Sequence, residues 1–169
     1  MSRPDWDRYF MSMAKLAAWR TTCLRRRVGC VLAKDRRVLA TGYNGAPSGA
    51  PHCIDAGCVR CELNVPSGER TELCRAVHAE QNAVAQAARF GTALEGCTAY
   101  VTCQPCAMCM KSLMQAGCVR VVWSGDGYPD ALGLQLAAEA GWVMRGKNSC
   151  WTSSPGAPTP TRAPSSSRR

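Results

Sequence analysis

The chain has 169 residues, 46% of them apolar, and it carries a net charge of +9 and 12 cysteines. This length allows one domain with a substantial core. Because no apolar run could span a bilayer and the N-terminal residues are charged instead of apolar, we expect a cytoplasmic protein whose reduced cysteines are buried or bind metal. The positive charge suits either nucleic acid or an anionic small substrate.

The first part of the chain predicts a helix followed by a β-hairpin. Apolar residues recur at three- and four-residue spacing over residues 4–24, which is typical of an amphipathic helix. Two apolar runs, 28–33 and 38–43, flank a polar tetrapeptide and predict the two strands of a hairpin. Between helix and hairpin stands a run of three arginines, which is either a solvated surface or an anion-binding site. These arginines are Arg25, Arg26 and Arg27.

A cysteine-rich loop follows, over residues 44–74. Its Gly, Pro, Ser and Cys content continues for longer than an idle connection within one domain. Four of its cysteines are spaced C-x4-C-x2-C-x12-C, and a histidine precedes the first of them. A second, structural Zn²⁺ bound by these side chains would order a loop that has no core of its own. Alternatively, they are small buried thiols, one or two of which line the functional site. The residues are His52, Cys53, Cys58, Cys61 and Cys74.

Strands and helices alternate in the second half of the chain. Helices are predicted over 76–90, which ends before a glycine, over 106–116, which follows a proline, and over 131–140. Strands are predicted at 97–101, 119–124 and 142–144. This alternation indicates an α/β fold with the three layers of an α/β/α sandwich. We assign one domain to residues 1–149, and we expect the Ser-, Pro-, Thr- and Arg-rich residues 150–169 to form a disordered tail.

Two short motifs, HAE at 78–80 and PCAMC at 105–109, predict a catalytic zinc site. One imidazole and two thiolates, from His78, Cys106 and Cys109, leave the fourth position of a catalytic Zn²⁺ open for water. Glu80 can take a proton from that water and return it to the substrate without binding the metal. The pattern H-x-E with P-C-x-x-C is the signature of the zinc-dependent nucleobase deaminases.

Further stretches make this resemblance more specific. The chain contains GYNGAPSG at 42–49, the cysteine-rich loop before HAE, QAGCVRVVW at 115–123 and GDGYPD at 125–130. Over residues 5–145 it resembles the deoxycytidylate (dCMP) deaminases of the cytidine deaminase-like superfamily. The resemblance implies a central mixed five-stranded sheet. It also implies hydrolysis of dCMP to dUMP and ammonia, in which zinc-bound hydroxide attacks C4 and Glu80 shuttles the protons.

The resemblance also implies which residues bind the substrate. Asn44 would contact the sugar and base, backbone groups of Ala79 and Cys106 would hold the base, and Tyr128 would lie near the nucleotide. Asn44 and Tyr128 also suit plain turns, so both interpretations stay open. The phosphate needs cations, and the arginine run is the first candidate. The competing residues are Arg25, Arg26, Arg27, Lys111 and Arg120.

Members of this family are commonly hexamers, and many are activated by dCTP and inhibited by dTTP. The resemblance implies a second nucleotide site with a Mg²⁺ ion at the GYNGAPSG loop. The residues of this allosteric loop are Gly42, Tyr43, Asn44, Gly45, Pro47 and Gly49. We expect a homo-oligomer, most simply a hexamer, that binds nucleotides and neither nucleic acid nor a membrane.

Three alternative functions stay open. A tRNA adenosine deaminase, or another nucleic-acid deaminase, shares the P-C-x-M-C form and suits a basic chain, but it does not account for residues 42–49 or for the cysteine-rich loop. A zinc-stabilised binding module without catalysis would have no use for Glu80 beside an open metal position. A riboflavin-pathway deaminase is the third alternative.

Overall fold

Residues 3–125 and 130–146 are described by the computed structural model of the protein. Two predictions, the nucleotide contact of Tyr128 and the disordered tail at 150–169, lie outside these residues. Within the described residues, no helix is both long enough and apolar enough to cross a membrane.

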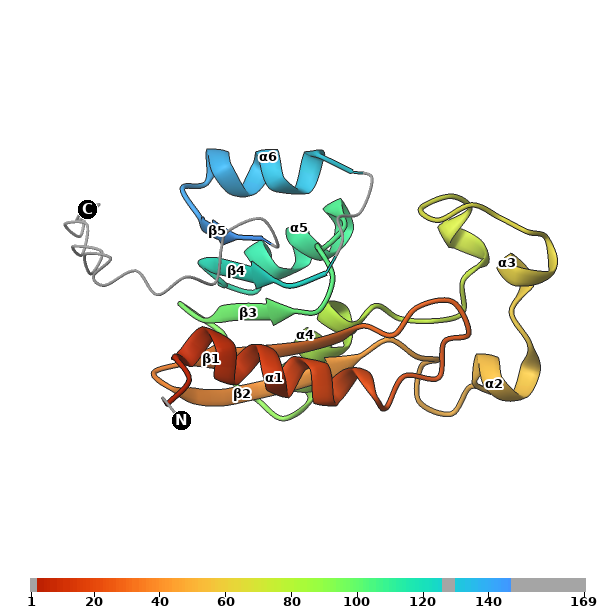
Figure 1. Ribbon diagram of the computed structural model, residues 1–169, viewed down its shortest axis with the longest axis horizontal. Helices are drawn as coiled ribbons and strands as arrows, with labels where there is room; N and C mark the ends of the chain where they lie inside the picture. The colour runs from red at the N-terminus through yellow and green to blue at the C-terminus, as the bar shows by residue number, and fades with distance from the viewer. Residues whose placement is uncertain (1–2, 126–129, 147–169) are drawn as a thin grey trace.

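A mixed five-stranded sheet forms the centre of the fold, in the order β2-β1-β3-β4-β5 (Figure 1). Strand β1 is antiparallel to both of its neighbours, whereas β3, β4 and β5 run parallel to one another. The predicted mixed five-stranded sheet is therefore confirmed. The strands are β1 (Gly29–Lys34), β2 (Arg37–Tyr43), β3 (Thr98–Val101), β4 (Arg120–Trp123) and β5 (Val143–Arg145).

The hairpin of β1 and β2 closes through a tight turn. Its two turn residues, Asp35 and Arg36, have φ angles of 50° and 63°. Left-handed backbone at both positions matches the twist of the two strands. Within β1, the residues from Gly29 to Ala33 are buried because helices cover both faces of the strand.

Helices cover the two faces of the sheet (Figure 1). Helix α1 (Trp6–Ala18) packs on one face, and α4 (Ala79–Arg89) and α5 (Ala107–Gln115) pack on the other. Helix α6 (Leu132–Glu139) packs against α5 and β5. Alternate residues of β1 serve the two layers, since Val31 lies among the side chains under α1 and its neighbours Cys30 and Leu32 lie among those under α4.

Two helices are shorter than the periodicity predicts. Helix α1 ends at Ala18 because the next residues bond to the loop: the Thr21 hydroxyl donates to the Asn44 carbonyl oxygen at 2.9 Å. Helix α4 begins at Ala79, since His78 is its N-cap residue with an extended backbone. The end of one helix and the start of the other thus lie beside the same loop.

The cysteine-rich loop contains three short elements that the sequence pattern did not indicate. These are α2 (Cys53–Ala56), α3 (Val59–Glu62) and a 3₁₀ turn, η1 (Thr71–Leu73). Helices α2 and α3 lie beyond the end of the sheet, on the side where α4 begins (Figure 1). The loop therefore forms a separate wall next to the HAE motif.

Candidate functional site

The predicted metal ligands meet because α4 and α5 begin side by side on one face of the sheet. His78 and Cys106 are the N-cap residues of α4 and α5, and Cys109 lies one turn into α5. Their ligand atoms all lie within 4.8 Å of one another, and no other such group of His, Cys, Asp or Glu occurs among the described residues. The Nδ1 atom of His78 lies 3.2 Å from Sγ of Cys109 and 3.6 Å from Sγ of Cys106.

The electrostatics of this cluster suit a metal cation. A hydrogen bond from Cys109, assisted by His78 and opposed by burial, lowers the pKa of Cys106 to about 4. The same interaction raises the pKa of Cys109. The hydrogen bond with Cys106 also raises the pKa of His78. Because one imidazole and two thiolates are a preferred donor set for zinc, the residues present fit a Zn²⁺ ion.

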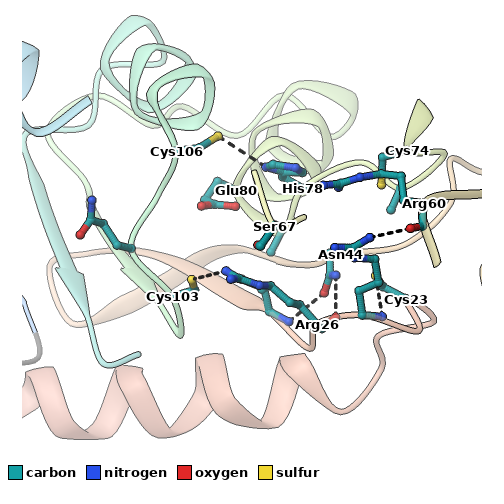
Figure 2. Close-up of a pocket in the computed structure, with 15 residues that line it drawn as sticks. Cys23, Arg26, Asn44, Arg60, Ser67, Cys74, His78, Glu80, Cys103 and Cys106 are labelled. Carbon is teal, nitrogen blue, oxygen red and sulfur yellow. Dashed lines mark hydrogen bonds between the residues drawn. The ribbon is translucent and has the colours of Figure 1, made fainter. Parts of the chain in front are cut away.

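Glu80 lies beside these ligands and is almost completely buried. It is the second residue of α4 and only 4% exposed. Burial raises the pKa of its carboxyl above the usual range, with Cys106 adding to the effect and His78 opposing it. Figure 2 shows its carboxylate next to His78 and Cys106. A carboxyl group with a raised pKa is suited to accept a proton and to return it.

His78, Glu80 and Cys106 line one cavity, together with cationic and polar side chains. A concave site with a few converging polar groups is typical of small-molecule binding. Its opposite wall comes from the chain before β1 and from the cysteine-rich loop, which contribute Arg26 and Ser67 among others (Figure 2). The structure therefore brings the chain before β1, the cysteine-rich loop and the starts of α4 and α5 to one site.

Asn44 lines this cavity but also holds its wall together. Its amide oxygen accepts a hydrogen bond from the Val28 N–H at 2.8 Å and another from the Thr21 hydroxyl, and its amide nitrogen donates to the Arg26 carbonyl oxygen at 2.8 Å. These bonds use both acceptor positions and one of the two amide hydrogens. The predicted contact with sugar and base stays a prediction, and the turn interpretation is incomplete, because the side chain is buried and bonded.

The arginine run divides into three different environments. Arg25 lines the cavity, but its two terminal nitrogens donate to the carbonyl oxygens of Arg60 and Val65 at 2.9 and 2.6 Å. Arg26 also lines the cavity and lies 3.6 Å from the sulfur of Cys103. Arg27 is exposed and lies outside the cavity, beside a separate surface hollow.

The two competing cations lie elsewhere. Arg120 donates two hydrogen bonds to Asp7 of α1, at 2.8 and 2.6 Å, and is thus part of an ion pair that joins helix to sheet. Lys111 is exposed on α5 and does not line the cavity.

Two residues of the site, Arg60 and Asp130, were not predicted from the sequence. Arg60, inside α3 of the cysteine-rich loop, is 7% exposed and lines the cavity. Its only sequence signal is its position between Cys58 and Cys61 of the predicted zinc loop. Asp130 accepts a hydrogen bond from the Ala107 N–H at 2.9 Å and so fixes the start of α5. It stands in the GDGYPD stretch, of which only Tyr128 was given a role by the resemblance.

The predicted ligands of a second zinc lie near one another without converging. Cys53, Cys58 and Cys74 line a second hollow, and the side chains of Cys58 and Cys61 are hydrogen-bonded. No three donor atoms of this set come within 4.8 Å of one another, as those of His78, Cys106 and Cys109 do. His52 bonds through Nδ1 to the Thr22 hydroxyl, at 3.0 Å. The second zinc stays a prediction.

The predicted allosteric loop packs directly against the start of α4. A Cβ atom on Gly42 would lie 2.1 Å from the Ala79 carbonyl oxygen, so β2 approaches the helix closely only because this residue is glycine. Gly45 exchanges two backbone hydrogen bonds with Val77, at 3.2 and 2.9 Å. Tyr43 lines a further hollow on the outer side of α4, and Pro47 and Gly49 belong to an exposed turn.

The chain is similar to known deaminases in sequence. A family model described as the cytidine and deoxycytidylate deaminase zinc-binding region matches residues 4–124. The deoxycytidylate deaminase of Schizosaccharomyces pombe is 42% identical over 85% of this chain and 44% of the yeast protein. The deoxycytidylate deaminase of Mycobacterium phage D29 is 46% identical over 73% of this chain and 97% of the phage protein. The chain spans less than half the length of the S. pombe relative and of the Saccharomyces cerevisiae one, of which it covers 46%.

The fold is similar to that of a solved dCMP deaminase. The crystal structure of the dCMP deaminase from cyanophage S-TIM5, in complex with dCMP and dUMP, superposes with a TM-score of 0.70 at 28% identity. The match covers 86% of this chain and 99% of the phage chain. The cytidine deaminase-like fold implied by the sequence resemblance is therefore confirmed.

Proposed function

The chain belongs to the family of cytidine and deoxycytidylate deaminases, and we propose that it hydrolyses dCMP to dUMP and ammonia in the cytoplasm. The observation that supports this most strongly is the convergence of His78, Cys106 and Cys109 beside the buried Glu80, at a cavity that also carries arginines. The first three side chains would hold Zn²⁺. The arginines suit the phosphate of a nucleotide.

The proposed reaction needs one group that moves protons, and Glu80 is placed for it. When bound, Zn²⁺ supplies the Lewis acidity that makes water nucleophilic near neutral pH. Glu80 takes one proton from the water that attacks C4 and delivers it to N3 of the cytosine. It then passes the remaining hydroxyl proton to the departing amino group, so that ammonia leaves and C4 keeps a carbonyl oxygen. Backbone groups of Ala79 and Cys106 would orient the base.

The test is to incubate the purified protein with dCMP, CMP, deoxycytidine, dCTP and a tRNA anticodon stem, and to follow ammonia release. We expect dCMP to react with the highest kcat/KM. Reaction of the tRNA alone would replace this proposal by a nucleic-acid deaminase, and absence of any reaction by the zinc-loaded protein would favour a binding module.

We also propose a second, structural zinc in the cysteine-rich loop. In support of it, one hollow is lined by Cys53, Cys58 and Cys74, and the thiols of Cys58 and Cys61 are hydrogen-bonded. Metal analysis should find about two zinc ions per chain, and the loss of one of them in Cys58→Ser without loss of the catalytic ion. One zinc ion per chain, unchanged in that variant, would contradict the second site.

Regulation and assembly follow the family resemblance. We propose that dCTP with Mg²⁺ and dTTP act at the loop of residues 42–49 in a hexamer. Support for coupling comes from Gly45, which pairs through its backbone with Val77, the residue before His78. Light scattering should give the mass of a hexamer, and dCTP with Mg²⁺ should lower the KM for dCMP. A monomer whose KM does not respond to either nucleotide would contradict both proposals.

A further inference from the structure

Arg60 is an incompletely bonded cation in the wall of the cavity. Its side chain is 7% exposed, and its Nε is the one buried side-chain nitrogen or oxygen without a hydrogen-bond partner among the described residues. One terminal nitrogen donates to the Pro66 carbonyl oxygen at 3.1 Å. No carboxylate of the described part of the chain forms an ion pair with it. A buried charge and an unmet donor are both unfavourable unless something compensates them.

The position of Arg60 is fixed by another arginine. Arg25 donates to the carbonyl oxygens of Arg60 and of Val65, the residue before Pro66, and so holds the backbone of α3 and the residues after it. Figure 2 shows the Arg60 guanidinium extending from the loop toward His78. Both residues line the cavity.

We propose that Arg60 binds the 5′-phosphate of the substrate and makes the protein select a nucleotide over the corresponding nucleoside, an inference that rests on the proposed deamination. A phosphate monoester supplies the negative charge and the acceptor oxygens that Nε and a terminal nitrogen lack, in the two-pronged geometry that a guanidinium favours. Arg25 acts as the positioning residue for it.

This assignment differs from the one suggested by the sequence. The arginine run was the first candidate for the phosphate. However, both terminal nitrogens of Arg25 donate to backbone carbonyl groups, and Arg27 lies outside the cavity. Arg26 also lines the cavity and can assist. Of the three arginines at the cavity, Arg60 is the most deeply buried, and a contact in a dry environment contributes most to selectivity.

The test compares a nucleotide and a nucleoside in the same variant. For Arg60→Gln we expect kcat/KM for dCMP to fall about 100-fold, with less than about a threefold change for deoxycytidine. Competitive inhibition by dUMP should weaken in parallel, and inhibition by deoxyuridine should stay the same. Arg70→Gln, which removes an exposed arginine from the same loop, is the matched control. It should leave unchanged the preference for dCMP over deoxycytidine as substrate and for dUMP over deoxyuridine as inhibitor.

A different outcome identifies a purely structural Arg60. The phosphate contact is disproved if Arg60→Gln lowers kcat/KM by the same factor for dCMP and for deoxycytidine. It is also disproved if the variant keeps the wild-type preference for dUMP over deoxyuridine as inhibitor. If Arg60→Gln does not fold, Arg60→Lys replaces it: a lysine keeps the charge without the fork, and dCMP preference should fall about tenfold. Unchanged preference in Arg60→Lys would overturn the proposal. Failure of the wild-type protein to deaminate dCMP would instead refute the proposed function.

Discussion

Glu80 is the residue whose environment is most specific to the proposed reaction. A carboxyl group that is 4% exposed, with a pKa raised by burial, would be a costly choice for packing alone. We expect Glu80→Gln to keep the shape of the site and its zinc, because Glu80 is not one of the three ligands. Turnover of dCMP should fall by about 10²- to 10⁴-fold, the usual contribution of a positioned acid–base group. Zinc content and kcat measured on the same preparation check this.

The control for that variant is Glu139→Gln, on the exposed end of α6, where the carboxylate accepts a hydrogen bond from Gln135. It should keep wild-type kcat. Substantial turnover by Glu80→Gln with its full complement of zinc would remove Glu80 from the mechanism.

At the scale of elements, one carboxylate joins α1 to three strands. Asp7 accepts hydrogen bonds from Tyr100 at 2.9 Å and from Arg145 at 2.9 Å, and from Arg120 at 2.8 and 2.6 Å. Burial raises its pKa, but Arg120, Tyr100 and Arg145 together outweigh burial and hold the pKa below 3.8. Asp7→Asn should therefore lower the free energy of unfolding by about 2 kcal/mol at pH 7. Urea denaturation measures this.

The pH dependence of the same interaction has a defined sign. Because the pKa of Asp7 is lower in the folded state, its contribution is complete above about pH 4 and is lost as the pH falls further. The stability difference between wild type and Asp7→Asn should thus shrink toward pH 2.5. Asp35→Asn, in the exposed hairpin turn, is the matched control and should change stability by less than about 0.5 kcal/mol. An equal effect of the two substitutions would contradict the network.

The contact of β2 with α4 yields another prediction at this scale. Alanine at Gly42 would place a Cβ atom 2.1 Å from the Ala79 carbonyl oxygen and 2.6 Å from the Ala83 N–H nitrogen. Gly42→Ala should push α4 away from the sheet, cost about 1–3 kcal/mol of stability and weaken zinc binding. Thermal unfolding and zinc titration measure both. Ser48→Ala, in the exposed part of the same loop, should change neither. If Gly42→Ala alters only the response to dCTP, the residue acts through an effector site instead of packing.

At the scale of the whole molecule, the metal ligands join two helices that belong to different parts of the chain. His78 begins α4 and Cys106 begins α5, and both helices pack on one face of the sheet. Zinc binds only the folded protein, so at a free zinc concentration about 1,000 times its Kd it should raise the free energy of unfolding by about 4 kcal/mol. We therefore expect a strong chelator to lower the Tm by about 10 °C. Differential scanning calorimetry checks this.

Two variants make the calorimetric result specific. Glu80→Gln should respond to the chelator as the wild type does, whereas His78→Ala should start with a lower Tm and respond less. An identical response of His78→Ala and wild type would place the stabilising ion elsewhere, in the cysteine-rich loop.

The sequence by itself determined the five strands, the four longer helices and the ligands of the metal site. Short apolar runs predicted the strands, most clearly β1, because a strand that helices cover on both faces must be apolar on both. HAE and PCAMC predicted the zinc ligands because each motif places its residues within the first turn of one helix, where spacing alone fixes their geometry. The resemblance to dCMP deaminases depended on further stretches, above all GYNGAPSG at 42–49 and the cysteine-rich loop.

Only the tertiary structure decided which cations face the site. The sequence does not distinguish Arg25, Arg27 and Arg120. In the structure Arg25 donates to carbonyl groups of the loop, Arg27 is exposed, and Arg120 forms an ion pair with Asp7. Arg60 had no motif of its own, and it reaches the cavity because the cysteine-rich loop folds back toward the start of α4. Long-range contacts of this kind leave no periodic or local pattern in a sequence, whereas spacing within one helical turn does.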